Sequence, residues 1–418
     1  MNEEYPRLRA IEAFPVEHEG EQFIALRDPA GFTSSVVMLP GGVVEIVALF
    51  DGSHSFVDIQ AELMRRHGEI VPRAQLEELV GGLDEHGFME SARFAECRAA
   101  IEGEFLASPV RPASHAGGAY AAEPDELRQA MDAFFSQPEG PGPIEWPGAP
   151  SRGVVGAITP HIDFHRGGPA YAWAYRRLAE QCDGDLFVIF GTCHAGMEDP
   201  FALTRKDYAT PLGPAVVDRD FVESVAARAG QDCFASELAH RGEHSIEFQA
   251  VFLRYLFGER RNFTIVPILA SFAHEALARG RGPEDDPRVA RFLDAVAGAI
   301  ATSRRRVTLI AGADLAHVGP RFGDPEPVSP EELRRIERED REMLGAVEAG
   351  DARAFFDAVA RDRDRRRICG YSPIYATLRL LGRARGDLHR YGQWPDPQGV
   401  VSFASVTFQW PGNDRQIP

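Results

Sequence analysis

The stretch VVGAITPHIDFHRGG, residues 154–168, joins an apolar run to two histidines and an aspartate. The run VVGAIT, residues 154–159, predicts a strand covered on both faces, because short, nearly continuous apolar segments are typical of buried strands. Coordinating side chains placed directly after such a strand are costly if they only pack. We therefore expect His161 and its neighbours to form part of a functional site.

The same pattern recurs along the rest of the chain and decides the fold class. Comparable apolar runs are DLFVIFG (185–191), FTIVPIL (263–269), VTLIAGA (307–313) and VVSFASVTF (400–408). Helical patterns alternate with them, including one that begins at Pro169 and one capped by Ser329. Over residues 153–418 this alternation predicts an α/β fold with a central, mostly parallel sheet flanked by helices. Ligand sites in such sheets lie beyond the carboxyl ends of the strands.

The segment before residue 153 divides into two parts. Residues 1–105 predict a small winged-helix-like α+β domain, with strands at QFIAL and SSVVML and two amphipathic helices, the first capped by Ser55. Residues 106–152 are rich in proline and small residues and predict a linker. This linker contains a domain-entry helix, PDELRQAMDAFFSQ, which Pro124 opens.

Composition excludes several classes of protein. The 418 residues contain no apolar run of the ~18 residues that span a bilayer, and the N-terminus has no apolar leader, so we expect a cytoplasmic protein that does not enter the membrane. Five scattered cysteines without a CxxC pair argue against a disulfide framework. The net charge of −18 makes nucleic acid a poor partner. Because no P-loop, no G-x-S-x-G motif and no GxGxxG motif after a strand occur, phosphoryl transfer and Rossmann-type redox chemistry lose support.

Four histidines share contexts that favour a metal site. His161, His194 and His317 each follow a predicted strand, and His244 opens a predicted helix. A single loop histidine is usually solvated, but several at equivalent strand ends favour ligation of a divalent metal. With Asp314 or Glu243 as a carboxylate, two histidines suit non-haem iron, whereas three histidines suit zinc or iron. The remaining histidines are left unassigned (His115) or are expected to be structural or at the surface (His165, His240, His274), and the RDRDRRR run at 361–367 is expected to be a solvated charged turn.

From Arg111 onward the chain resembles the MEMO family, component B of the bacterial AmmeMemoRadiSam set. The matching segments are RPASHAGGAY, TPHIDFHRGGPA, FVIFGTCH, YATPLG, GEHSIEFQ, FTIVPIL, ADLAHVGPRF, ICGYSPI and VSFAS. The resemblance implies a fold similar to that of LigB-type class III extradiol dioxygenases, which hold Fe(II) by two histidines and a carboxylate. The first domain, with LFDGSHS before two amphipathic helices, resembles the PqqD-like family of peptide-binding modules.

The MEMO resemblance also implies roles for individual residues. His161 and His194 match its metal-binding histidines, and His244 matches a histidine that lines the same cleft or completes the ligand set. Some members carry a cysteine ligand at the position of Ala316, which leaves the third ligand open between Asp314, His317 and His244. Supporting roles around the ligands are expected for Asp163, Glu243 and Cys369, the last of which matches a family cysteine.

Three functions follow from these expectations. The first is a metal-dependent oxidoreductase, with Fe(II) in first place and Zn or Cu as alternatives, which works with a radical SAM protein and draws acid–base chemistry from His244, His317 and Asp314. The second is a non-catalytic protein that binds a peptide or a partner through the MEMO cleft and the N-terminal module. The third, a transcription regulator, is disfavoured because the second amphipathic helix of that module carries more acids than bases.

Overall fold

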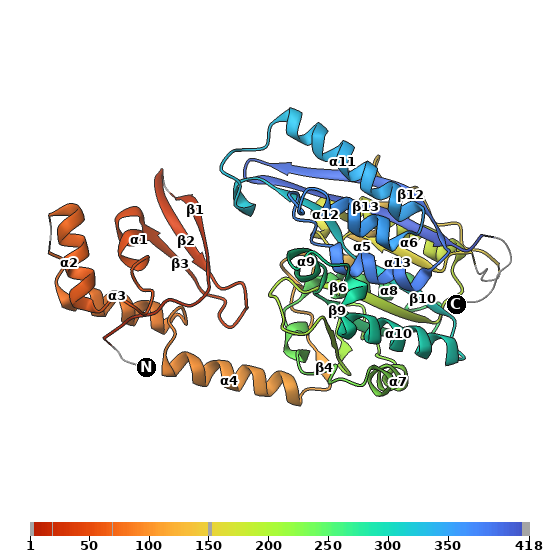
Figure 1. Ribbon diagram of the computed structural model, residues 1–418, viewed down its shortest axis with the longest axis horizontal. Helices are drawn as coiled ribbons and strands as arrows, with labels where there is room; N and C mark the ends of the chain where they lie inside the picture. The colour runs from red at the N-terminus through yellow and green to blue at the C-terminus, as the bar shows by residue number, and fades with distance from the viewer. Residues whose placement is uncertain (1–3, 19, 69, 149–152, 412–418) are drawn as a thin grey trace. The chain divides into compact units, whose positions relative to one another are not determined.

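The computed structural model describes residues 4–18, 20–68, 70–148 and 153–411 of the chain. The chain divides into two compact units, Met1–Ala107 and Ser108–Pro418 (Figure 1). Among the described residues, no helix combines the length and apolar character that crossing a membrane requires.

The first unit packs helices on a small antiparallel sheet. Its sheet has the order β1-β2-β3, and its core includes Leu39, Ile59, Leu76 and Phe88. The elements are β1 (Glu12–His18), β2 (Glu21–Arg27), β3 (Val36–Pro40), α1 (Gly41–Val47), α2 (Phe56–His67), α3 (Arg73–Glu85) and α4 (Ala92–Ala107).

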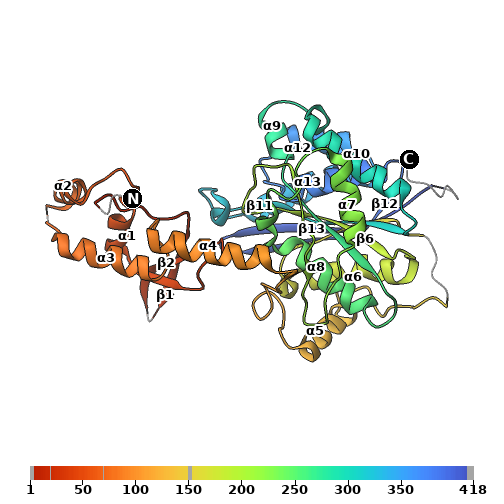
Figure 2. The ribbon, with the colours of Figure 1, turned by 90° about the horizontal axis from the view of Figure 1, so that it is seen from below.

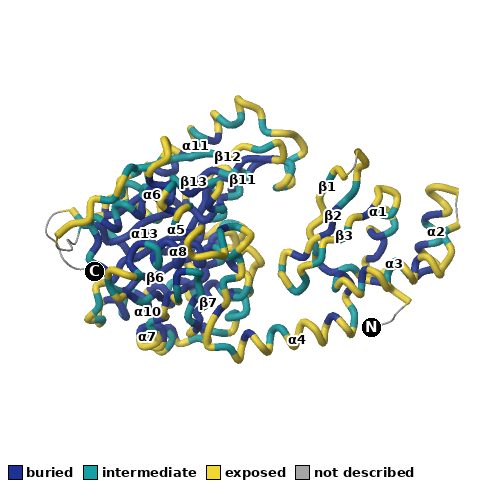
Figure 3. Tube along the Cα trace, turned by 180° about the vertical axis from the view of Figure 1, so that it is seen from behind, coloured by how far each residue is buried: buried dark blue, intermediate teal, exposed yellow. Residues whose placement is uncertain are grey.

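Local signals explain part of this first unit. Ser55 caps α2 as expected, since its side chain accepts a hydrogen bond from the Asp58 backbone N–H while the Asp58 carboxylate accepts one from Ser55 N–H. The segment FMES, residues 88–91, contributes an isolated antiparallel bridge between Met89 and Leu8. Helix α4 follows it, in a stretch whose residues are mostly exposed (Figure 3).

The second unit is built on a large mixed sheet with the order β11-β13-β5-β10-β6-β9-β7, and β12 pairs with β13. The pairs β5–β10, β10–β6 and β6–β9 are parallel, and the strands outside this centre pair antiparallel. The strands are β5 (Gly156–Thr159), β6 (Leu186–Thr192), β7 (Phe201–Leu203), β9 (Thr264–Ala270), β10 (Val307–Gly312), β11 (Asp314–Val318), β12 (Arg385–Asp396) and β13 (Gly399–Gln409), with a separate parallel pair β4 (Val110–Arg111) and β8 (Asp207–Tyr208). The predicted α/β sheet is confirmed as a mixed sheet with a parallel centre.

Helices cover both faces of this sheet (Figure 2). Helices α6 and α8 pack on one face, with α5 against α6, and α13 packs on the other with α10 and α12 against it. The helices are α5 (Pro124–Ser136), α6 (Phe164–Gln181), α7 (Arg219–Ala229), α8 (His244–Phe257), α9 (Ala273–Ala278), α10 (Pro287–Thr302), α11 (Pro330–Glu348), α12 (Ala352–Ala360) and α13 (Tyr371–Leu381), with short 3-10 turns at Glu237–His240, Pro283–Asp285 and Pro320–Phe322.

Two local predictions need adjustment. Helix α6 begins at Phe164 rather than at Pro169, which lies inside the helix. His317 does not end β10, because Asp314–Val318 forms the separate strand β11, paired antiparallel with β13. The central strands are buried along their length, so polar side chains collect at their carboxyl ends.

Candidate functional site

His161 and His194 meet beyond the carboxyl ends of β5 and β6. Both strands lie beside β10, which separates them in the sheet. Each histidine comes two residues after its strand ends, and the two ring centroids are 4.9 Å apart. The predicted convergence of these two imidazoles is therefore present.

The hydrogen bonds of the two rings fix which nitrogen of each ring is left free to bind a ligand. His161 Nδ1 lies 2.9 Å from the carbonyl oxygen of Gly312, which only accepts, so Nδ1 carries the proton. His194 Nδ1 lies 3.0 Å and 3.1 Å from the two carboxylate oxygens of Glu243, which hold its proton in the same way. Both Nε2 atoms are left with their lone pairs available, the arrangement found in ligating histidines.

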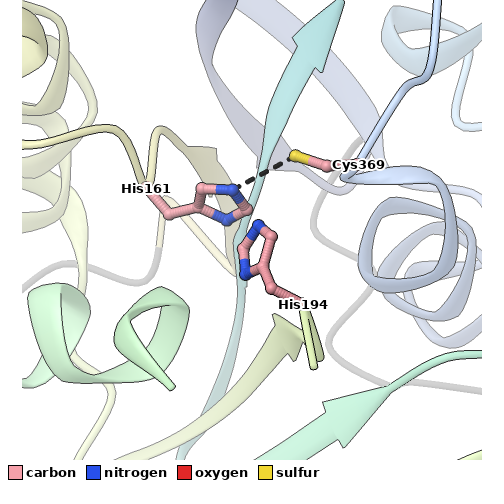
Figure 4. A group of neighbouring side chains, drawn as sticks. All are labelled: His161, His194 and Cys369. Carbon is pink, nitrogen blue, oxygen red and sulfur yellow. Dashed lines mark hydrogen bonds between the residues drawn. The ribbon is translucent and has the colours of Figure 1, made fainter. Parts of the chain in front are cut away.

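Cys369 supplies a third atom that could bind a metal. Its Sγ lies 3.1 Å from His161 Nε2, and because that nitrogen is an acceptor, the thiol donates. Single ligand atoms of His161, His194 and Cys369 all lie within 4.8 Å of one another. Figure 4 shows the three side chains turned toward a common point. Cys369, predicted only to support the ligands, thus joins the two histidines in a candidate ligand set.

The turn before α13 holds Cys369 against β11. Gly370 N–H donates to the Asp314 carbonyl (3.1 Å), and Thr192 Oγ1 donates to the Cys369 carbonyl (3.0 Å). A Cβ on residue 370 would lie 2.5 Å from the Asp314 carbonyl oxygen, so glycine allows the close approach. The turn therefore fixes the sulfur relative to both strand ends.

Glu243 and His244 lie beside His194 at the start of α8. The Glu243 carboxylate caps α8 through the N–H groups of His244 and Ser245 (2.9 and 3.0 Å) and also accepts from His194 N–H (2.8 Å). His244 stacks on His194 with ring centroids 4.6 Å apart, and His194, Glu243 and His244 form a second group with metal-ligand spacing. Because the Glu243 oxygens are already engaged by N–H donors, the set with Cys369 is the better candidate.

Burial and neighbouring charges set the protonation states of the pocket. Burial lowers the pKa of His161 to about 3 and the pKa of His244 well below its ordinary value. Burial also disfavours the charged form of His194, but the Glu243 carboxylate outweighs it and raises the pKa of His194. Burial raises the pKa of the Cys369 thiol well above its usual range. His161 and His244 are therefore held in the neutral form that ligands need, whereas a metal at His194 Nε2 would have to displace the proton that Glu243 favours on that ring.

Asp314 and His317 lie at the edge formed by β11. The Asp314 carboxylate accepts from the His161 backbone N–H (2.9 Å), and its other oxygen is 3.7 Å from His161 Nε2. Burial raises the pKa of Asp314 to about 6 and lowers the pKa of His317. Burial thus shifts the pKa values of the two residues expected to take part in acid–base chemistry in opposite directions, upward for Asp314 and downward for His317.

The other histidines and Asp163 have separate partners. Asp163, expected to support the ligands, lies at the start of α6, 3.8 Å from Arg166, and the group that contacts His161 Nδ1 is the Gly312 carbonyl. His240 is buried between Tyr208 OH and the Ala202 carbonyl. His165 and His274 pair with Arg166 and Asp364, away from the ligand set.

A buried ionic network that was not predicted from the sequence contacts the backbone of Glu243. The Glu247 carboxylate bonds to Arg111, to Tyr120 OH and, at 2.9 Å, to His115 Nδ1. Arg111, fully buried, also donates to the Glu243 carbonyl (2.7 Å). All five of these residues lie in the segments RPASHAGGAY and GEHSIE, but nothing in the sequence indicates that the two segments meet.

Comparison with known protein families gives one match that includes the candidate ligands. The model of the Memo-like protein family matches residues 111–407, which is well over half of the chain and includes every residue of the pocket. The chain belongs to the Memo-like family.

Individual relatives show how far the likeness extends. A MEMO1 family protein of Aquifex aeolicus is 26% identical over 403 residues, covering 95% of this chain and 99% of the relative. MEMO1 family proteins of Thermus thermophilus and Methanopyrus kandleri are 30% and 29% identical, covering 79% and 70% of this chain. The Aquifex match extends over the first unit, so both units occur together in another member of the family.

Proposed function

We propose that this Memo-like protein binds a divalent transition metal through His161 Nε2, His194 Nε2 and Cys369 Sγ and uses it in oxidoreductase chemistry. The observation that carries the proposal is the mutual approach of these three atoms within 4.8 Å, with both Nδ1 atoms already held by other acceptors. Ligands at one face of an ion leave further positions for substrate.

The chemistry of the three donor atoms narrows the choice of metal. Imidazole and thiolate suit iron, zinc and copper, whereas magnesium and calcium prefer oxygen ligands. Fe(II) is the first expectation from the resemblance to class III dioxygenases, and Zn and Cu are the alternatives. The Cys369 thiol must lose its proton on binding, so we expect proton release with metal uptake.

The surrounding residues have defined tasks in this proposal. Fe(II) would supply electrons and polarise a chelating substrate. His244, neutral and next to both ligand imidazoles (ring centroids 5.2 Å from His161), would accept a substrate proton. Asp314 and His317 would exchange protons on the opposite side. Glu243 orients His194 and Gly312 orients His161.

Metal analysis of the full chain tests the site. After anaerobic reconstitution with Fe(II), Zn(II) or Cu(I), we expect about one equivalent of metal in the unchanged protein. His161→Ala, His194→Ala and Cys369→Ser should each lose most of it, because two ligands remain. His165→Ala is the matched control, since that ring pairs with Arg166 near the surface. Retention of metal by all three ligand variants would refute the proposal.

The proposed partner is a radical SAM protein, and the support for it is the resemblance to component B of the AmmeMemoRadiSam set. Co-expression of the two chains, with affinity capture of one, measures the association. Failure of the radical SAM protein to co-purify at micromolar concentrations would remove the partner and leave the metal site standing.

A second candidate function is peptide recognition by the first unit. A groove of about 430 Å³ lies between β3 and α3, lined by Val37, Leu39, Leu79 and Leu83 among others. Val36 and Met38 on β3 are 56% and 43% exposed. An extended peptide can add to such a strand while its side chains enter the groove.

The groove is tested in the full chain with a peptide from the proposed radical SAM partner or its substrate. Leu79→Glu, which places a charge in the groove, should abolish binding measured by calorimetry. Val57→Glu on the exposed side of α2 is the control. Equal affinities of the two variants would remove this candidate.

A further inference from the structure

The second half of the arginine-rich run at residues 361–367 is buried or half-buried rather than solvated. Its Arg366 side chain is only 3% exposed and forms an ion pair with Asp340 of α11, which is 0% exposed. Arg365 bonds to Glu332 and Glu339 on the same helix (3.0 and 2.6 Å). The expectation of a solvated turn is therefore wrong for residues 364–367, although residues 361–363 are exposed as expected.

Asp340 connects this run to the edge of the large sheet. Besides Arg366, its carboxylate accepts from Ser402 Oγ of β13 (2.6 Å) and from Tyr391 OH of β12 (2.9 Å). Ser402 Oγ in turn accepts from the Ala316 N–H of β11 (2.9 Å). A single buried carboxylate thus ties together α11, β11, β12, β13 and the run.

Hydrogen bonds connect the run to His317 and to the turn that carries Cys369. The Arg366 carbonyl accepts from His317 N–H (2.7 Å), and Arg367 Nε donates to the His317 carbonyl (2.9 Å). The Asp364 carboxylate accepts from Ile368 N–H (2.8 Å), immediately before Cys369. Both His317 and the Cys369 turn therefore take their position from this segment.

The backbone of the run is held in an unfavourable conformation. Arg363, Asp364 and Arg367 have φ angles of 58°, 54° and 52°, in the left-handed region that non-glycine residues rarely adopt. Such conformations persist only where the surroundings over-determine them. Arg366 lies between Asp364 and Arg367 in the sequence, and it pairs with Asp340 through side chains that are 3% and 0% exposed.

We infer that Asp340 and Arg366 are positioning residues for the metal centre, which hold the 361–370 turn so that Cys369 Sγ stays within reach of His161 and His194. The inference rests on the proposed metal site. A buried ion pair that does not touch the metal would then determine the affinity for the metal and the formation of the metal–sulfur bond.

Cobalt(II) titration of the full chain tests this, because a thiolate bond to cobalt produces a charge-transfer absorption. Asp340→Asn should weaken cobalt binding by about 10- to 100-fold, the range for residues that orient metal ligands, and reduce the charge-transfer band. Arg361→Met is the matched control within the same run, since Arg361 pairs with Glu342 through side chains that are 67% and 66% exposed. It should bind cobalt like the unchanged protein.

The double variant Asp340→Asn/Arg366→Met separates positioning from folding. Removing both charges leaves no unpaired buried ion, so the melting temperature should recover relative to Asp340→Asn. Cobalt affinity and the charge-transfer band should stay reduced, because the turn has lost its anchor. Recovery of affinity together with stability would overturn the inference, as would single and double variants that both bind like the unchanged chain. If the unchanged chain binds cobalt without a thiolate band, the proposed site fails as well.

Discussion

At the scale of single residues, the space around Gly370 constrains the candidate site. A Cβ there would lie 2.5 Å from the Asp314 carbonyl oxygen and 2.7 Å from the Ala313 side chain. We expect Gly370→Ala to lower stability by about 1–3 kcal/mol and to weaken metal binding, because the Cys369 turn must move away from β11. Thermal unfolding and metal titration measure the two effects. Gly345→Ala in α11, where nothing lies within 4 Å, should instead be neutral or slightly stabilising.

His240 makes stability depend on pH. Burial lowers its pKa from 6.5 to about 3, so the unfolded chain binds a proton at a pH where the folded protein does not. The free energy of unfolding should therefore fall as the pH drops from about 6.5 toward 3, by up to ~1.4 kcal/mol per pH unit. The stability difference between the unchanged chain and His240→Gln should shrink between about pH 7.5 and pH 5 in denaturant unfolding. A difference that is constant with pH would contradict this.

At the scale of helices and strands, the elements that could be predicted from the sequence are those whose side chains form a clear pattern of burial. The apolar runs became strands because burial on both faces leaves a continuous pattern, as in β6 and β10. Strand β12, half-buried and polar, and β11, formed by pairing with β13, left no such pattern. The candidate ligands likewise divide into those that the sequence pattern predicts and one that it does not. His161 and His194 were predictable from strand ends, whereas the place of Cys369 depends on a turn that distant contacts shape.

Capping of α2 gives a prediction for the first unit. Ser55 and Asp58 satisfy each other's N–H groups at the start of this helix. Ser55→Ala should cost about 1 kcal/mol and speed hydrogen exchange in the first turn of α2. Ser53→Ala, whose hydroxyl bonds only to exposed neighbours at Asp51 and His54, should leave that exchange unchanged. Equal exchange in the two variants would mean that the cap contributes no stability.

At the scale of the whole molecule, the pocket belongs to one unit. All candidate ligands and their supporting residues lie within residues 108–418, and the Methanopyrus relative is matched over 97% of its own length while covering 70% of this chain. A fragment of residues 108–418 should therefore fold cooperatively and bind metal with unchanged affinity, as circular dichroism and metal titration would measure. A loss of affinity of more than about tenfold would assign the first unit a part in forming the site.

The separation of His161 and Cys369 by 208 residues has a consequence for biosynthesis. While the ribosome is still making the chain, the histidines emerge long before the sulfur that would join them, and strand β13, which pairs with β5 and β11, comes later still. A nascent polypeptide therefore exposes an incomplete chelate. Metal binding at the proposed site would therefore have to wait until Cys369 has been synthesised and β13 has joined the sheet beside β5 and β11.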